Sequence, residues 1–411
     1  MTQIKVLEVL EANTGGARKH VHQLLLGLDH ERFDLHLACS LERDPSAEDD
    51  LEPLRAAGVR VTTVPMVRRP SPTADLRALR QLGALMRSHH YDLVHTHASK
   101  AGFLGRLAAH RRKIGAVVHT PHTFPFERVD TLLRPIYRAL ERLAAGWADR
   151  IVMLTPSQHH TALANRLCDE DRLVVVENGI APPTAEPEAL RRQYREQLGL
   201  APDTPAVALI GRVTPQKDVQ AFLSVAQDLL RVLPHARVFL VGGADNRAYL
   251  RSLRPRASDE AWRVLEGGET PSSPVEWSPD LPLQVLGHRT DAAELVAAFD
   301  TVLLPSRYEG LPYSLLEAMV CGVPVVASDV TGNRDVVRHG QCGLLAAPGD
   351  LRDFARWTLK VLTEPDFRTQ LSEQARARVA DSFTEAGFLA RMTDLYASAV
   401  EAAALRRKWT R

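Results

Sequence analysis

The chain lacks a long hydrophobic run and an excess of charge of either sign, and we expect no secretory leader. A membrane-spanning helix needs about 20 consecutive apolar residues, and no run approaches that length. The first residues, MTQIK, lead into a strand-like segment without the apolar core and cleavage site of a signal peptide. With 51 basic and 50 acidic side chains, the overall charge offers no case for nucleic-acid binding. We therefore expect a cytoplasmic protein, with peripheral contact at the inner face of a membrane left open.

Cysteine is also scarce, and the few cysteines form no pattern. There are four, at positions 39, 168, 321 and 342. Their wide spacing fits neither a zinc site nor a disulfide framework. We expect reduced thiols, most of them buried as small core residues.

The chain does contain two series of apolar, strand-like runs separated by helical patterns. A length of 411 residues with 45% apolar composition is enough for two hydrophobic cores. The first series predicts strands at 5–10, 33–39, 60–64, 93–96, 116–119, 151–154 and 173–176. The second predicts strands at 206–210, 237–241, 283–286, 301–304, 324–327 and 343–345. Strands that alternate with helices indicate an α/β fold, here two Rossmann-like, doubly wound parallel-sheet domains facing a central cleft.

The domain boundary is expected at the turn-forming segment NGIAPPT, residues 178–184. We predict an N-terminal domain over residues 1–180, a C-terminal domain over 181–382 and a terminal helix over 383–411. The segment 252–282 is rich in Pro, Ser, Glu and Trp and is longer than a usual connection. It is predicted to be a partly ordered excursion of unassigned role.

The segment PSRYEGLPYSLLEA, residues 305–318, places two glutamates eight positions apart where a strand ends and a helix begins. The turn Gly-Leu-Pro breaks the strand, so Glu309 is expected in the loop and Glu317 in the helix. Ligands of open α/β sheets bind at such strand ends. A carboxylate there can accept sugar hydroxyls, and backbone N–H groups of the turn can face phosphate oxygens. Two ordinary surface acids are the alternative.

A second candidate follows the first predicted strand of the C-terminal domain, in GRVTPQKD, residues 211–218. Arg212 can hold phosphate oxygens with a planar fork of donors, and Lys217 adds a point charge. Negative charge grows on a diphosphate leaving group as its bond to a sugar breaks, so fixed cations stabilise that transition state more than the ground state. Two solvated surface charges are the alternative.

In the N-terminal domain, the first predicted strand leads into NTGGARKH, residues 13–20, where a glycine turn lets the backbone approach a ligand closely. This is not the three-glycine dinucleotide fingerprint, which disfavours a nicotinamide enzyme. His20 by itself is better interpreted as a helix-surface or packing residue.

Histidines recur at the ends of two further strands, in HTH at 95–97 and HTPH at 119–122. We expect no metal there, because no Asp or Glu stands at ligand spacing from these histidines and no Asp-x-Asp motif accompanies a donor site. A single imidazole such as His122 can instead donate to a sugar hydroxyl or orient an acceptor.

Together with the strand AMVCGVPVVA at 318–327, these motifs make the chain resemble the large retaining glycosyltransferase family of the GT-B fold, family 4. That family's signature is two glutamates separated by seven residues and followed by a Gly-Val-Pro-Val-Val strand. The resemblance covers nearly the whole chain and implies that the last helix packs back on the N-terminal domain. It implies metal-independent transfer of a hexose from a nucleotide-diphosphate sugar, with UDP- or GDP-sugars favoured. The acceptor would be a hydroxyl of a glycan, glycolipid or small molecule.

The resemblance also implies roles for particular residues. Glu309 would hold hydroxyls of the transferred sugar, Glu317 the nucleotide ribose, and His122 would face the reacting sugar. Arg212 and Lys217 would hold the diphosphate. The remaining donor-site candidates are Gly16, Gly310, Leu311, Pro312 and Arg289, and the acceptor candidates are His20, Ser99 and Lys100. The segment from position 99 resembles the subgroup that acts on cell-surface polysaccharide and glycolipid intermediates, although a solvent-facing helix start explains Lys100 equally well.

One further helix is expected over residues 128–147, with apolar residues at helical spacing and arginines between them. Such a helix can lie on an anionic membrane. Packing of the apolar stripe against the protein's own sheet is the commoner outcome, and we expect it here.

Two other functions are compatible with the sequence. A catalytically silent sugar-nucleotide-binding scaffold would keep the fold but would be free to lose the charged groups named above. A sugar-nucleotide epimerase would need acid and base groups but no acceptor. The charged groups and His122 are all present, which favours a transferase.

Overall fold

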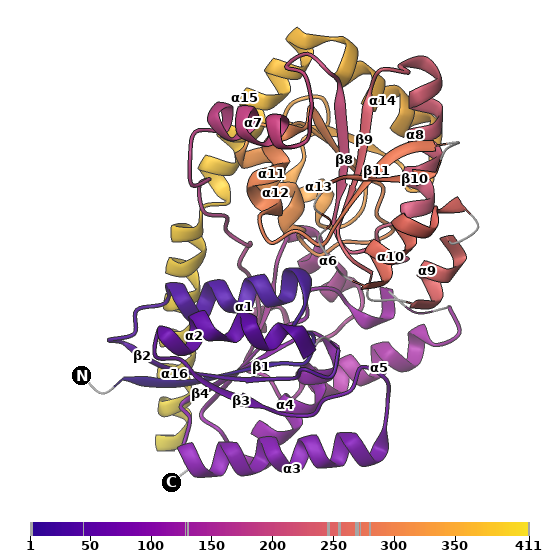
Figure 1. The fold of residues 1–411 in the computed structure, drawn as a ribbon. Coiled ribbons are helices and arrows are strands. Elements are labelled where there is room, and N and C mark those ends of the chain that lie inside the picture. The colour runs from indigo at the N-terminus through magenta and orange to yellow at the C-terminus, as the bar shows by residue number, and fades with distance from the viewer. Residues whose placement is uncertain are drawn as a thin grey trace. The chain divides into compact units, whose positions relative to one another are not determined.

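The structure is a computed structural model that describes residues 3–43, 45–127, 129, 131–244, 247–253, 256–267, 271, 273–278 and 281–409. The chain divides into two compact units. Unit 1 comprises Met1–Gly179 and Ala386–Arg411, and unit 2 comprises Ile180–Glu385. Each unit contains one seven-stranded sheet with helices packed on it (Figure 1).

The sheet of unit 1 is parallel throughout, with strand order β3-β2-β1-β4-β5-β6-β7. Its strands are β1 (Ile4–Leu10), β2 (Phe33–Cys39), β3 (Arg60–Thr63), β4 (Leu93–His97), β5 (Ala116–Thr120), β6 (Arg150–Met153) and β7 (Leu173–Val175). The chain leaves β1 toward one edge of the sheet and leaves β4 toward the other, so the winding reverses between these two strands. Ligands of open α/β sheets bind beyond the strand ends at such a reversal.

Helices cover both faces of this sheet. They are α1 (Gly15–Gly27), α2 (Glu52–Ala56), α3 (Pro72–His89), α4 (Ser99–Arg112), α5 (Arg134–Ala145), α6 (Pro156–Ala164) and α16 (Glu385–Trp409), with short 3-10 turns η1 (Pro45–Leu51), η2 (Pro125–Glu127) and η3 (Glu170–Arg172). Alternation along β1 sends Val6 and Leu10 to the core beneath α1 and α16. Leu7 and Val9 join the core beneath α3 and α4. Glu8 has the parity of Val6 and Leu10, so its carboxylate lies in the apolar layer that α16 covers.

The sheet of unit 2 has strand order β10-β11-β9-β8-β12-β13-β14. Its strands are β8 (Ala206–Ile210), β9 (Arg237–Val241), β10 (Val275–Ser278), β11 (Leu281–Gly287), β12 (Thr301–Leu304), β13 (Val325–Ser328) and β14 (Leu344–Ala346). All neighbours pair in parallel except β10 and β11. The winding reverses between β8 and β12, which are adjacent. This arrangement confirms the predicted α/β fold class.

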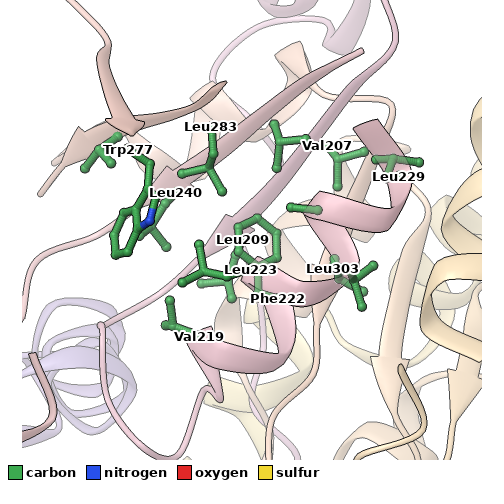
Figure 2. Close-up of a cluster of buried hydrophobic side chains, with 14 of the residues drawn as sticks. Val207, Leu209, Val219, Phe222, Leu223, Leu229, Leu240, Trp277, Leu283 and Leu303 are labelled. Atoms are coloured by element: carbon green, nitrogen blue, oxygen red, sulfur yellow. The ribbon is translucent and has the colours of Figure 1, made fainter. Parts of the chain in front are cut away.

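The antiparallel edge strand β10 was not predicted. It belongs to the segment 252–282, which we expected to be a partly ordered excursion. Within that segment, residues 254–255, 268–270, 272 and 279–280 lie outside the described residues. The described part contains α10 (Asp259–Gly267) and β10, and Trp277 of β10 is buried in the same core as Leu240 and Leu283 of the neighbouring strands (Figure 2). The segment therefore extends the sheet and its core.

The remaining helices of unit 2 connect its strands. They are α7 (Pro187–Gln197), α8 (Val219–Val232), α9 (Arg247–Leu253), α11 (Ala292–Leu295), α12 (Tyr313–Val320), α13 (Asn333–Val336), α14 (Leu351–Thr363) and α15 (Pro365–Ser382), with a 3-10 turn η5 (Val296–Ala298). Helix α8 begins at Asp218, whose side chain accepts a hydrogen bond from the Ala221 N–H. Its buried face, which includes Phe222 and Leu229, packs on β8 and its neighbours (Figure 2). Burial of each of these side chains stabilises the fold by about 1.5–3 kcal/mol. Their packing holds α8 on the sheet and so sets the position of its first turn and of Asp218 just before it.

For residues 128–147, the structure differs from the expectation in the start of the helix and in the packing of its apolar stripe. Helix α5 begins at Arg134, and residues 128 and 130 lie outside the described part of the chain. The apolar stripe does not pack as core, because Leu132, Ile136 and Leu143 are all exposed. In the described part of the chain, no helix combines the length and the apolar character needed to cross a bilayer.

Candidate functional site

In unit 2, the loops that follow β8 and β12 are joined by hydrogen bonds and an ion pair, at the point where the winding of the sheet reverses. The Arg307 N–H donates to the Gln216 carbonyl at 2.8 Å, and the Arg307 guanidinium pairs with Asp218 at 2.9 Å. The Gln216 side-chain amide donates to the Tyr308 carbonyl at 3.1 Å. The two candidate motifs of this domain, 211–218 and 305–318, therefore form one site.

Glu309 is the centre of that site. Lys217 Nζ lies 2.8 Å from Glu309 Oε1, and Gln216 Nε2 donates to Oε2 at 3.1 Å. Both members of the ion pair are nearly buried. A carboxylate has about four acceptor positions, so two remain for hydroxyl donors while Lys217 and Gln216 hold the group in a fixed orientation.

A glycine on the next strand connection sets the path of this loop. Gly332 follows β13 and has φ +88°, and a Cβ there would overlap the carbonyl oxygen of Gly310 and crowd that of Glu309. Only glycine combines that backbone conformation with so close an approach. The turn at Gly310 is thus held against a second loop of the same unit.

The structure places the other candidates of unit 2 as follows. Gly310 and Leu311 are buried in the turn, and Pro312 is the N-cap of α12, the helix that carries the half-buried Glu317. The half-buried Arg212 lies in the loop after β8. Arg289 forms a two-point ion pair with Asp291, at 2.7 and 2.6 Å, so its guanidinium is engaged within its own loop.

In unit 1, a buried hydrogen-bonded chain runs from Glu8 to His122. His97 Nε2 lies 2.7 Å from Glu8 Oε2, and His97 Nδ1 lies 3.2 Å from His122 Nε2. Burial raises the pKa of Glu8, but its electrostatic interactions and hydrogen bonds with His95 and His97 outweigh this effect and hold that pKa well below its usual range. Glu8 is therefore ionised and can only accept, so His97 carries its proton on Nε2.

That assignment fixes the next tautomer. Burial is the main reason that the pKa of His97 falls to about 4 and that of His122 falls well below its ordinary value, so both rings are neutral near pH 7. His97 then offers a lone pair at Nδ1, and His122 donates its Nε2–H to it. The remaining nitrogen of His122, Nδ1, is left as a hydrogen-bond acceptor.

Tyr396 of α16 completes the same chain from the other side. Its hydroxyl donates to Glu8 Oε1 at 2.6 Å and accepts from His95 Nδ1 at 2.6 Å. His95 Nε2 then accepts from the Thr120 hydroxyl at 2.8 Å. Each of these buried polar atoms has a partner of the right kind, so the network specifies one arrangement.

The backbone at His122 is strained. Its φ is +59°, which is uncommon for a residue with a side chain, and Gln158 Nε2 donates to its carbonyl at 2.8 Å. Gln158 is in turn held through its Oε1, which accepts from the Leu154 N–H at 2.9 Å. A residue kept in such a conformation by a dedicated clamp indicates a functional constraint.

His20 stands beside this chain. Its Nδ1–H donates to Asn178 Oδ1 at 2.8 Å, and its ring contacts that of His122 edge to face, with centroids 4.9 Å apart. Its Nε2 is buried and has no hydrogen-bond partner among the described residues. Burial lowers the pKa of His20 to about 3, so the ring is neutral and Nε2 is an acceptor.

One reason given for excluding a metal is wrong. Glu8 does approach the strand-end histidines, and its ligand atoms, with those of His95 and His97, lie within 4.8 Å of one another. The same holds for His20, His97 and His122. These are the groups in the described ranges whose donor atoms are close enough to hold a metal ion. The hydrogen bonds described above satisfy both ring nitrogens of His95 and His97 without an ion. That the reaction requires no metal stays a prediction.

The remaining candidates of unit 1 lie at helix starts. Gly16 is the second residue of α1, and Ser99 is the first of α4. Lys100 is not a solvated cation, because its Nζ pairs with both oxygens of Asp75, at 2.7 and 2.8 Å. An acceptor phosphate would have to compete with that carboxylate.

Sequence reasoning missed the residues that hold these side chains in place. They are Glu8, Gln158, Asn178, Gln216, Gly332 and Tyr396. Glu8 had a visible signal, since it is the one acid in the apolar strand IKVLEVL. Asn178 and Gln216 lie within the segments 178–184 and 211–218 quoted above, but no role was assigned to them. Gln158, Gly332 and Tyr396 carry no local pattern that separates them from ordinary surface residues.

Two family models match the chain, one to each half. Residues 15–179 match a glycosyl transferase 4-like domain, and residues 191–378 match glycosyl transferases group 1. The chain is 28% identical over 376 residues to UDP-Gal:alpha-D-GlcNAc-diphosphoundecaprenol alpha-1,3-galactosyltransferase of Escherichia coli, covering 90% of each chain. It is 30% identical over 322 residues to D-inositol 3-phosphate glycosyltransferase of Streptosporangium roseum, covering 75% of this chain and 70% of that one.

A solved structure gives the same result for the fold. HepE of Anabaena in complex with UDP-glucose superimposes with a TM-score of 0.75 at 20% identity, covering 96% of this chain and all of that one. This likeness agrees with the predicted GT-B fold class. With the sequence relatives, it identifies the chain as a member of the group 1 glycosyltransferases, enzymes that use nucleotide sugars.

Proposed function

We propose that the protein moves a hexose from a UDP- or GDP-sugar to a hydroxyl of a lipid-linked or glycan acceptor in polysaccharide or glycolipid biosynthesis, with retention of configuration and without a metal. The first relative described above is named for transfer from UDP-galactose to a diphosphoundecaprenol-linked sugar. Its match along 90% of both chains supports a UDP-sugar donor and a lipid diphosphate acceptor here. The reaction would take place in the cytoplasm.

The observation that carries this proposal is the nearly buried Lys217–Glu309 pair at the sheet reversal of unit 2. Enclosing two charges is costly, and removing one partner leaves an unpaired buried charge. A site that keeps both groups at a strand end suits a ligand that supplies hydroxyl donors to one and phosphate oxygens to the other.

In this proposal Glu309 accepts two hydroxyls of the transferred sugar, and Lys217 keeps its pair with Glu309 while its other N–H donors face the diphosphate. Arg212 adds a second cation, and the backbone of the turn Gly310–Pro312 faces the phosphates. Glu317, one to two turns into α12, holds the ribose. Gly16 and Arg289 also belong to the donor site in this proposal, and Arg289 must first leave Asp291.

The chemistry follows from the charge that develops. The bond from the anomeric carbon to the leaving phosphate oxygen breaks, the acceptor oxygen bonds to that carbon from the same face, and the acceptor proton passes to the departing phosphate. Arg212 and Lys217 stabilise the negative charge on the leaving group. His122 faces the reacting sugar and accepts a hydrogen bond from a sugar hydroxyl at Nδ1, the nitrogen that is not bonded to His97. His20, Ser99 and Lys100 lie on the acceptor side.

The proposal is tested with purified protein, a chelator and a panel of UDP-, GDP- and ADP-sugars. A donor that binds the folded protein raises its melting temperature, and the shift identifies the nucleotide class. With that donor and a polyprenyl-diphosphate-linked sugar, product is expected in the presence of chelator, and its anomeric configuration is measured by NMR. Absence of any thermal shift, in a sample that melts cooperatively, would favour a silent scaffold; conversion of donor alone would favour an epimerase.

Two substitutions and a control assign the roles. Glu309→Gln is expected to lower turnover by about a hundredfold or more while changing nucleotide affinity little, because the sugar contact strengthens in the transition state. Glu317→Ala is expected to weaken nucleotide binding as well. Glu401→Gln, an exposed glutamate on α16, is the matched control and should leave both unchanged. Equal effects from the first two substitutions would contradict the assignment.

A further inference from the structure

Three histidines of unit 1 meet although they come from separate parts of the chain. His20 lies on α1, His97 ends β4, and His122 follows β5. One donor nitrogen from each lies within 4.8 Å of the other two. The transfer chemistry proposed above uses one nitrogen of His122 and does not explain why the three rings converge. We call His20, His97 and His122 the three-histidine site.

The spacing of the three-histidine site suits one tetrahedral ion. Zinc lies about 2.0–2.1 Å from a histidine nitrogen, so two such ligands are about 3.3 Å apart and their ring centres about 5 Å apart. His97 Nδ1 and His122 Nε2 are 3.2 Å apart. The ring centres are 5.4 Å apart for His20 and His97, 4.9 Å for His20 and His122, and 5.4 Å for His97 and His122. The rings thus already have the separations of zinc ligands.

Neighbouring groups leave two of these rings with a lone pair to offer. Asn178 Oδ1 accepts from His20 Nδ1–H at 2.8 Å, so the lone pair of His20 is on Nε2, which is buried and has no partner among the described residues. Glu8 Oε2 accepts from His97 Nε2–H at 2.7 Å, so the lone pair of His97 is on Nδ1. Histidines that bind metals donate their other ring N–H to a carboxylate or carbonyl in this way.

His122 can supply the third ligand by changing its tautomer. Its Nε2–H donates to His97 Nδ1. When an ion takes the lone pair of His97, the proton of His122 moves to Nδ1 and Nε2 becomes a ligand, so the ring keeps one proton throughout. His20 and His97 are fully buried and His122 is partly exposed. The ion therefore enters from the side of His122, and its fourth position is left for water.

The donor atoms select the kind of ion. Imidazole nitrogens favour Zn²⁺ and its neighbours in the transition series, whereas Mg²⁺ and Ca²⁺ prefer oxygen ligands. The group formed by Glu8, His95 and His97 is a weaker candidate, because Tyr396 and Thr120 already bond to both nitrogens of His95. His20 Nε2, by contrast, has no hydrogen bond to give up among the described residues.

We propose that the three-histidine site binds one Zn²⁺ ion, and that the bound ion inhibits the transferase. The ion would hold His122 through Nε2 and leave the proton on Nδ1. The nitrogen that accepts from the sugar hydroxyl would then be a donor, and that contact would be lost. The ion is no cofactor, since the proposed reaction proceeds without it. The binding goes beyond the proposed function, and only the inhibition rests on it.

The first experiment titrates the full, untagged chain with Zn²⁺ in competition with a chromophoric chelator, with neither donor nor acceptor present. We expect one ion per chain, with a Kd of about 1 μM or lower. Co²⁺ in the same site should give the intense visible absorption of a tetrahedral complex. Absence of a stoichiometric ion, or the weak absorption of six-coordinate Co²⁺, would overturn the proposal.

A ligand variant and a matched control locate the site. His20→Gln is expected to weaken Zn²⁺ binding by about a hundredfold or more, because it removes a ligand. His36→Gln should bind like the wild type, because His36 is also a buried histidine of unit 1 but bonds to Thr62 and Tyr91 instead. Equal affinities of His20→Gln and the wild type would contradict the site.

Asn178 separates a positioning role from a general effect on folding. Asn178→Ala is expected to weaken Zn²⁺ binding by about tenfold, since His20 loses the acceptor that fixes its tautomer. Asn178→Asp keeps an acceptor and should restore the affinity. Wild-type affinity in Asn178→Ala would contradict Nε2 as the ligand atom of His20.

A measurement on the wild type needs no buried substitution to fold. In ¹⁵N NMR, Zn²⁺ should shift the ring signals of His20, His97 and His122 and leave those of His36 unchanged. Unchanged signals of the three rings would overturn the proposal.

Turnover with and without Zn²⁺ tests the inhibition. Zn²⁺ at about ten times its Kd should lower turnover by about tenfold, since mass action leaves about a tenth of the chain without the ion. A chelator should restore the activity. Full activity of the zinc-loaded chain would overturn the inhibition. A chain that is inactive even with chelator would contradict the proposed function and not the zinc site, because the binding measurements use no substrate.

Discussion

At the scale of single residues, the site in unit 1 depends on which nitrogen of each histidine carries the proton. Glu8 sets that choice for His97, and His97 sets it for His122. In Glu8→Gln the amide NH₂ faces a donor on one side, so one hydrogen bond is lost and a buried polar group is left unpaired. We expect unit 1 to lose about 2–4 kcal/mol of stability and His122 to become a mixture of tautomers.

The measurement is ¹⁵N NMR of the histidine rings together with thermal unfolding. Glu11→Gln is the control. Glu11 directly follows β1 and is also buried, but its carboxylate pairs with Arg43, at 2.8 and 2.9 Å, and lies outside the histidine cluster. It should cost stability and leave the His122 spectrum unchanged. An unchanged His122 spectrum in Glu8→Gln would refute the relay of proton positions.

At the scale of elements, the loop that carries Glu309 is positioned by the connection after β13. Gly332→Ala places a Cβ on the Gly310 carbonyl and is expected to displace the turn, lower stability by more than about 2 kcal/mol and weaken nucleotide binding. Gly340→Ala is the control. Gly340 has a similar φ of +74° with no atom within 4 Å of an added Cβ, so it bears only the backbone cost of about 1 kcal/mol. Calorimetry compares nucleotide binding by the two variants. Equal affinities would show that the overlap of the new Cβ with the Gly310 carbonyl is relieved without moving the turn.

The positions of the strands were the part of the structure that the sequence predicted best. Thirteen strands were expected from apolar runs, and each is present within two residues of its predicted ends. The antiparallel strand β10 was missed, because it sits among Pro, Ser and Glu residues and owes its place to burial of Trp277. The stripe of α5 was predicted as core because periodicity gives the apolar face of a helix but does not say what covers it.

For the site, spacing identified the residues that face a ligand but not those that hold them. Glu309 and Lys217 stand out because they follow strands at a reversal. Tyr396 lies 388 positions from Glu8, and Gln216 lies 93 from Glu309, so their pairing depends on the folded sheet order and has no local signature.

At the scale of the whole molecule, acid is expected to act on unit 1 first. Burial is the main cause that lowers the pKa of His20 to about 3 and those of His22, His36 and His97 to about 4, and all four belong to unit 1. The unfolded chain, with histidine pKa values near 6.5, takes up protons as the pH falls below about 6.5, while the folded unit does not. Each histidine then removes about 1.4 kcal/mol of stability per pH unit down to about pH 4.

Hydrogen exchange read by mass spectrometry can follow the two units separately. We expect protection of unit 1 to fall between pH 7 and pH 5 by a larger factor than that of unit 2, after correction for the intrinsic exchange rate. A uniform loss across both units, or a loss confined to unit 2, would contradict the assignment of buried neutral histidines.

The contact between Tyr396 and Glu8 also bears on how the protein is made. A ribosome delivers β1 long before α16, because all of unit 2 is synthesised between them. The nascent first unit must therefore wait, with Glu8 and its histidines uncovered, until some 200 further residues have emerged. A message cut short anywhere before α16 would yield a chain with a complete unit 2 at most, and with the histidine cluster of unit 1 open to water.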